Sequence, residues 1–276
     1  MNKRLNIFLL TVCALVLIFV ISCKKTADTD PVIDQSCRAS NIEDYTETTL
    51  NNAYSLTYDD YRRLIQRAGK TNTFNVVYGT DKVTVTGTNG GSLDITLKDG
   101  RAIKTAAVGT TNYEEYTYNT SGYISEVKYY EAGTLKSTYT LSYSGGNLTQ
   151  IGRTDVGFIK DQTNTTTITY TTTPTNFNLQ FMEPFNTMVS NFNAPYRIYG
   201  NMSIGIVTKV VNDQSVKSGA ILNQTVTTND YLYLKDSVSN YNIITNKKNI
   251  KTLTDNTIVT DVTTNLKYNI GYSCKN

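Results

Sequence analysis

The sequence predicts an all-β protein, an antiparallel β-meander of hairpins that forms a large twisted sheet or a partial barrel. The chain has 21 tyrosines among 276 residues, and aromatic residues favour strands. Short runs alternate apolar and polar residues, as in Val83–Thr86, Thr138–Tyr143 and Leu266–Tyr272, so one face of each strand meets a core. Turn sequences lie between such runs, including Asn89-Gly90 and Asp99-Gly100, and they supply the positive φ angles of tight hairpins.

The first 22 residues predict an export signal. Lys3 and Arg4 form a short positive region, residues 5–21 are almost entirely apolar, and the small Ser22 precedes Cys23. An apolar run of about 17 residues is typical of a secretory signal. A run of this length also lies at the lower limit for a membrane-spanning helix, which is the competing interpretation.

The end of this signal is similar to the bacterial lipobox, in the form Val20-Ile21-Ser22-Cys23. The resemblance implies that Cys23 carries the lipid and becomes the first residue of the mature chain, anchored by several acyl chains. We therefore expect a lipoprotein signal peptide at 1–22, a lipid anchor and flexible tether at 23–40, and a single all-β domain at 41–276. Cys-Lys-Lys at this point is similar to Bacteroidota-type lipoproteins, which implies the outer membrane. Display at the cell surface and on the periplasmic side both remain open.

Two cysteines remain in the mature chain, Cys37 and Cys274. An exported protein enters an oxidising compartment. We expect a disulfide between these two residues, which would tie the start of the domain to its last strand. Two unpaired thiols are the alternative.

A weak hairpin repeat runs through the chain. Its best copies are Leu97–Ile103, Tyr118–Val127 and Tyr143–Ile151. In each, Asp, Asn or Gly makes the turn and an aliphatic residue begins the outgoing strand. The pattern resembles the Tyr-Asp-x-x-Gly-Arg-Leu-x-x-Ile motif of a Bacteroidota lipoprotein family of unknown function with a porin-like fold, although Arg62 replaces the turn Gly in the copy that begins at Tyr58. The resemblance implies a fold and an envelope location, and it implies no activity.

Two segments depart from the alternating pattern. Residues 176–199 contain Phe181, Phe185 and Met188 at helical spacing, which predicts a loop with a short amphipathic helix within residues 184–193. Its expected role is a plug over the open face or end of the sheet, and an apolar binding lip is the alternative. Residues 40–43 fit a capping box and predict a second helix start.

The strands do not match those of a membrane-spanning barrel. Membrane strands need about 9–11 residues with one uniformly apolar face. The runs in this sequence are short, and Thr, Asn and Lys are spread over them. The sequence therefore favours a β domain in water that is held at the membrane by its lipid.

The composition excludes several kinds of chemistry. The chain has no His, so an imidazole base, a His metal ligand and a Ser-His-Asp triad are impossible. Its net charge of +3 becomes smaller once Lys3 and Arg4 are removed, which argues against a nucleic-acid partner. Adjacent carboxylates such as Glu114 and Glu115 point to opposite faces of a strand and do not converge. We expect no enzyme activity, no metal and no other cofactor.

Tyrosines are the remaining candidates for recognition. If alternate positions align across strands, one third of the chain forms a ladder of rings on one face, made of Tyr113, Tyr116, Tyr118, Tyr123, Tyr129, Tyr139 and Tyr143. Such a face stacks on sugar rings or peptides, whereas simple cross-strand packing is the alternative. We expect a non-catalytic envelope lipoprotein with a structural or ligand-binding role and a glycan or envelope protein as partner. The rival interpretation is a carbohydrate-binding accessory lipoprotein of a nutrient-uptake system.

Overall fold

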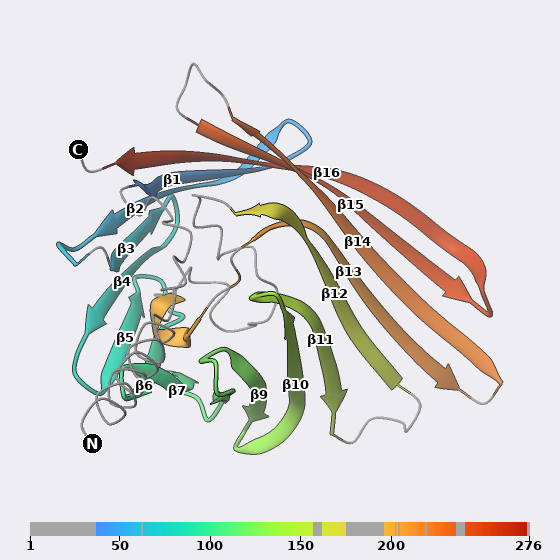
Figure 1. Ribbon diagram of the computed structural model, residues 1–276, viewed down its shortest axis with the longest axis horizontal. Coiled ribbons are helices and arrows are strands. Elements are labelled where there is room, and N and C mark those ends of the chain that lie inside the picture. Colours follow the sequence, from blue (N-terminus) through green and yellow to red (C-terminus); the bar gives the residue numbers. More distant parts are fainter. Residues whose placement is uncertain are drawn as a thin grey trace, which may run out of the picture. The chain divides into compact units, whose positions relative to one another are not determined.

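The computed structural model describes residues 37–61, 63–156, 162–174, 196–201, 203, 205–218, 220–235 and 241–274. In this part of the chain, sixteen antiparallel strands pair in sequence order, and the first strand pairs with the last (Figure 1). The all-β antiparallel prediction is confirmed. The predicted twisted sheet or partial barrel is wrong, because the pairing of β1 with β16 closes the sheet and leaves it without an edge.

The strands differ greatly in length. The first half holds β1 (Cys37–Thr46), β2 (Thr49–Tyr58), β3 (Leu64–Gly69), β4 (Thr73–Tyr78), β5 (Lys82–Gly87), β6 (Leu93–Lys98), β7 (Arg101–Ala107) and β8 (Tyr113–Tyr118). The second half holds β9 (Ile124–Glu131), β10 (Thr134–Ser144), β11 (Asn147–Asp155), β12 (Gln162–Pro174), β13 (Gly205–Ser218), β14 (Ile221–Lys235), β15 (Tyr241–Thr254) and β16 (Thr257–Cys274). The long strands β13 to β16 run side by side in Figure 1, toward the lower right.

Tight turns join many of the strands. Asp99 and Gly100, with φ of 52° and 74°, connect β6 to β7. Asp255 and Asn256, with φ of 49° and 65°, connect β15 to β16. Positive φ at both central residues is the requirement of a two-residue hairpin whose twist matches that of the strands. The turn that the sequence predicts at Asp99-Gly100 is therefore confirmed.

Alternate residues of each strand face the interior of the barrel. Val83 lies opposite Ile95, and Ile95 lies opposite Thr105; all three are 0% exposed. Residues opposite one another in register share a face, so the pairing extends this inner face from strand to strand. A large buried cluster on it runs from β4 to β13, and Ile42, Ile244 and Ile270 form a smaller one where β1, β15 and β16 meet.

Two local predictions differ from the structure, and a third falls on residues that the structure does not describe. Residues 37–40, which the sequence assigned to the tether, belong to β1 and begin its pairing with β16. The helix start predicted at residues 40–43 is wrong, because this segment pairs with β2 on one side and β16 on the other. The short helix predicted at 184–193 is not seen, since those residues lie outside the described ones; the helical turn nearby is a single 3-10 turn, η3 (Tyr196–Tyr199).

The export signal at 1–22 and the lipidation residue Cys23 also lie outside the described residues. Among the residues that the structure does describe, none forms a helix long and apolar enough to cross a membrane.

Candidate functional site

The outer wall of the barrel is polar. Threonine occupies four successive outward positions of β12, at Thr163, Thr165, Thr167 and Thr169, whereas Ile168 points inward and is buried. Charged side chains also line this wall. They form ion pairs that join neighbouring strands, with N–O distances of 2.7 Å for Lys82–Asp94, 3.6 Å for Lys209–Asp230 and 3.4 Å for Lys251–Asp261.

A lipid-facing wall would carry such charges only at a cost. Each Lys or Arg near the middle of a bilayer destabilises a membrane barrel by about 2–4 kcal/mol. Apolar side chains also face outward, as with Val77 on β4 and with Leu232 and Leu234 on β14, which are 66%, 57% and 48% exposed. On the described strands, charged and hydroxyl side chains therefore interrupt the apolar positions of the outer wall, whereas membrane barrels present an apolar band to lipid.

The seam between β1 and β16 also has polar and charged side chains on its outer side. On its outer side, Asn269 Nδ2 and Tyr45 Oη donate hydrogen bonds of 3.0 Å and 2.8 Å to Glu43 Oε2. These hydrogen bonds lower the pKa of Glu43, with the larger effect from Asn269. Lys267 Nζ lies 4.5 Å from the centroid of the Tyr45 ring. A charged network therefore fastens the closure of the barrel on the side that faces away from the core.

Inside the barrel, the chain itself fills part of the space. The inner segment, defined as Ile198–Asn201, Ser203 and Gly205, attaches to the inner wall on several strands, and Figure 1 shows η3 close to β7. Tyr199 is 1% exposed. Its Oη lies 2.9 Å from Thr105 Oγ1, and its ring packs edge to face against Tyr116 with centroids 5.2 Å apart.

Further hydrogen bonds hold the inner segment in place. Asn201 N donates to Gly122 O at 2.9 Å, and Gly205 N donates to Asn147 Oδ1 at 2.7 Å. Gly200 has a φ of 84°, and a Cβ at this position would lie 2.3 Å from Gly122 O. Only glycine fits so close to the opposite backbone. The inner segment and the apolar inner wall therefore form one core.

The inner wall of β8 to β12 carries a second feature, two adjacent cross-strand rows that are rich in polar side chains. In one row, Glu114, Tyr129, Ser137 and Asp155 lie opposite one another in turn. In the other, the successive residues are Tyr116, Val127, Tyr139, Arg153 and Asn164. We call these nine residues the polar rows.

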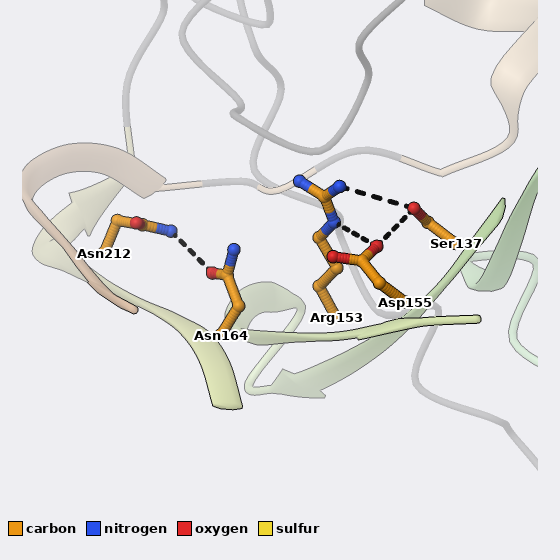
Figure 2. A network of polar contacts seen from close by, with 5 residues as sticks. All are labelled: Ser137, Arg153, Asp155, Asn164 and Asn212. Carbon is orange, nitrogen blue, oxygen red and sulfur yellow. Dashed lines mark hydrogen bonds and ion pairs between the residues drawn. The ribbon is translucent and has the colours of Figure 1, made fainter. Parts of the chain in front are cut away.

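The centre of the polar rows is an ion pair with fixed partners (Figure 2). Arg153 Nε donates to Asp155 Oδ1 at 2.8 Å, and Arg153 Nη2 donates to Ser137 Oγ at 3.4 Å. The Ser137 hydroxyl donates in turn to Asp155 Oδ1. Asn212, from β13, donates to Asn164 Oδ1 at 3.0 Å. The side chain of Asp155 is 8% exposed and that of Arg153 is 38% exposed, so the arginine is the member that solvent reaches.

The seven tyrosines of the predicted ladder do not share one face. Tyr113 points outward, where its ring stacks on Tyr130 with centroids 4.4 Å apart. Lys104 Nζ lies 3.6 Å from the centroid of the Tyr113 ring. Because Tyr130 and Lys104 both contact this ring, Tyr113 offers little room for a sugar to stack.

The other tyrosines lie on the inner side. Tyr116, Tyr118, Tyr129, Tyr139 and Tyr143 occupy inward positions of β8 to β10, and Tyr123 packs against Tyr143 with centroids 4.6 Å apart. Burial raises the pKa of Tyr118 and Tyr139. Most of these rings therefore pack in or against the core, and Tyr129 and Tyr139 belong to the polar rows. A ligand-binding role for the set stays a prediction.

Sequence reasoning missed Ser137, Arg153 and Asp155. A signal for two of them was present, because Ile151, Arg153 and Asp155 occupy alternate positions of one strand and therefore share a face. The register of β1 and β16 places Cys37 opposite Cys274, as the predicted disulfide requires, and the disulfide itself stays a prediction. Within the described residues, no group of three or more acidic or Cys side chains is placed to hold a metal ion.

Comparison with solved structures gives a fold relationship. The chain is similar to a porin-like protein from Bacteroides uniformis ATCC 8492, with a TM-score of 0.57 and 18% identity over 84% of this chain and 97% of that chain. No family model matches the chain, and no curated protein matches it. The lipoprotein family with the Tyr-Asp motif therefore remains a resemblance. At this level of identity the comparison shows the fold alone, and the fold of this chain is that of a porin-like β-barrel.

Proposed function

We propose that this protein is an envelope lipoprotein whose closed barrel stands in water at the outer membrane, held there by lipid on Cys23, with a non-catalytic structural or ligand-binding role. The proposal rests on one observation, the polarity of the barrel. Charged and hydroxyl side chains face outward, as in the pair Lys209–Asp230, and the apolar core faces inward. A barrel with this wall needs a separate attachment to the membrane, and the lipobox-like sequence that ends at Cys23 offers one.

The interior supports a closed domain in preference to a conducting pore. The inner segment spans from Thr105 on β7 to Asn147 on β11 through the contacts of Tyr199 and Gly205. A water-filled channel has a polar lumen. In this barrel, a large apolar cluster and the inner segment line the part of the interior that β4 to β13 enclose.

Membrane fractionation tests the proposal. The full chain, expressed in a Gram-negative host that processes lipoproteins, should sediment with the membranes, incorporate labelled palmitate and need detergent for its release. A second version, with residues 1–22 replaced by an ordinary cleavable secretory signal and with Cys23→Ser, should appear as a folded, detergent-free protein in the periplasmic extract. Cys13→Ser in the full chain is the matched control, because it removes a thiol from the export segment and leaves the lipidation residue Cys23 intact.

One result would overturn the proposal. If the version without the lipid still sediments with membranes and resists alkaline carbonate, the wall itself inserts into the bilayer. A separate experiment, protease treatment of intact cells, decides the side of display, since only a surface-exposed barrel is digested.

The polar rows favour a second candidate, a carbohydrate-binding accessory lipoprotein of a nutrient-uptake system. Glycan binding by the purified protein would support it, together with loss of growth on the same glycan when the protein is deleted. Normal growth of the deletion strain on every glycan that the protein binds would count against it.

A further inference from the structure

We propose that the polar rows bind a neutral, hydroxyl-rich ligand, a glycan segment with vicinal hydroxyl groups, and that Arg153, held in place by Asp155, is its principal donor. The inference rests on the proposed function, in which the barrel is a water-exposed binding domain. It adds the site and the chemical class of the ligand.

Arg153 and Asp155 lie on β11 at a distance from the inner segment. Gly205 and Ser203 attach to Asn147 and Leu148, at the start of β11. Arg153 is six residues further along the same strand, which corresponds to about 20 Å of extended chain. Side chains from three other strands, β9, β10 and β12, lie in register with it. The pair therefore lies on a wall that the contacts of the inner segment do not cover.

The guanidinium of Arg153 has a fixed orientation. Asp155 accepts from Nε and Ser137 accepts from Nη2, and the guanidinium carbon lies 5.5 Å from the centroid of the Tyr139 ring. Figure 2 shows the remaining nitrogen, Nη1, pointing away from both partners. A donor that is already held in place loses little conformational entropy when it binds a ligand. Arg153 is thus suited to recognition at its outer edge.

The charges of the site favour a neutral ligand over an anion. Asp155 is in contact with Arg153 and offsets its positive charge. Glu114 adds a carboxyl group in the same row as Asp155, and its side chain is 1% exposed. An anionic ligand would therefore meet no net positive charge. A hydroxyl group both donates and accepts, which matches an arginine beside a carboxylate.

The flanking side chains complete the match to a sugar. Asn164 lies opposite Arg153, and its Oδ1 accepts from Asn212, which leaves the amide nitrogen as a further donor. The ring of Tyr129 stands in the row of Asp155, whereas the ring of Tyr139 supports the Arg153 guanidinium. Tyrosine offers an apolar ring for the C–H face of a sugar and a hydroxyl for its polar edge.

The test uses the mature lipoprotein purified in detergent and an array of neutral and uronic-acid-containing oligosaccharides. We expect binding to neutral oligosaccharides, and titration calorimetry with the strongest of them should show affinity that is about tenfold or more lower in Arg153→Ala. Lys209→Ala is the matched control, because it removes one positive charge from an ion pair on the outer wall. It should bind like the wild type.

A second variant guards against a folding defect in Arg153→Ala. Asn164→Ala leaves the Arg153–Asp155 pair intact and should weaken binding about threefold or more, with an unchanged circular dichroism spectrum. The inference is overturned if no neutral oligosaccharide binds, if only acidic ones bind, or if both variants bind like the wild type. A barrel that binds no glycan but leaves the membrane once its anchor is removed would retain the proposed function and lose this inference alone.

Discussion

Tyr199 and Thr105 are 94 residues apart in the sequence, and their hydroxyl oxygens lie 2.9 Å apart inside the barrel. Both side chains are buried. Burial raises the pKa of Tyr199, so its hydroxyl stays protonated and keeps this hydrogen bond over the ordinary pH range. The contact fastens the inner segment to β7 and makes the wall and its filling a single cooperative core.

Substitutions of Tyr199 should therefore destabilise the barrel in two steps. Tyr199→Phe leaves the buried Thr105 hydroxyl without this partner and should lower the free energy of unfolding by about 1–2 kcal/mol. Tyr199→Ala also removes the ring and should cost about 3–5 kcal/mol. Tyr61, which is 77% exposed, is the control, and Tyr61→Ala should change stability by less than about 0.5 kcal/mol. Urea unfolding measures all three, and equal stability of Tyr199→Ala and the wild type would show that the inner segment is not part of the core.

The seam predicts a disulfide. Cys37 and Cys274 are opposite one another in the register of β1 and β16, and a bridge between them would close nearly the whole domain into a loop. In the chain-entropy treatment, such a loop stabilises the fold by about 5 kcal/mol. Under non-reducing conditions, the mature protein should therefore resist alkylation at both residues, and a reductant should lower its melting temperature. Cys37→Ser should melt at the temperature of the reduced wild type, whereas two freely alkylated thiols in the oxidised protein would contradict the prediction.

The same seam should weaken in acid. Hydrogen bonds from Asn269 and Tyr45 lower the pKa of Glu43 below its ordinary value of 4.5, and the backbone and side chain of Asn265 lower that of Glu47. As the pH falls, the unfolded chain binds these protons first. The stabilisation is therefore present above the ordinary pKa and is lost as the pH falls through the lower, folded pKa values.

Unfolding measured between pH 6 and pH 3 tests this seam prediction. The wild type should lose stability over this interval, and the double variant Glu43→Gln, Glu47→Gln should lose less, because it has two fewer groups to protonate. Parallel pH profiles of the two proteins would contradict the role given to these carboxylates.

Charge substitutions on the two faces should have opposite outcomes. Leu232 lies on the outer wall and is 57% exposed, whereas Val85 faces the core and is 0% exposed. Leu232→Asp should change stability by less than about 0.5 kcal/mol. Val85→Asp should prevent folding, because it buries an unpaired charge. Circular dichroism and the yield of folded protein measure the difference, and a tolerated Val85→Asp beside a disruptive Leu232→Asp would mean that the outer wall is the apolar one.

Local chemistry explains which parts of the fold could be predicted. The turn at Asp99-Gly100 and the alternation at Val83–Thr86 depend on residues next to one another, so both are visible in the sequence. Closure depends on contacts such as that between Glu43 and Asn269, which are 226 residues apart. No local sequence pattern indicates that the strand at residues 37–46 pairs with two other strands, β2 and β16. For this reason the sequence predicted a twisted sheet or a partial barrel, and the local capping-box pattern at residues 40–43 predicted a helix.

The site was predictable only in part for the same reason. Strict alternation already separates Tyr113 from Tyr116, since residues three apart on a strand point to opposite faces. It does not say which face a closed barrel will enclose. Arg153 and Asp155 look like ordinary surface charges until closure places them on the inner wall, where Ser137 from the neighbouring strand completes their hydrogen bonds.

The pairing of β1 with β16 also bears on how the molecule is made. Among the described strands, synthesis delivers β1 first and its partner β16 last, so two unpaired strand edges persist until the end of β16 has emerged. Bare edges are templates on which other chains assemble. A product truncated before β16 would keep both unpaired edges. Closure of the barrel therefore distinguishes full-length molecules from truncated ones by their tendency to assemble with other chains.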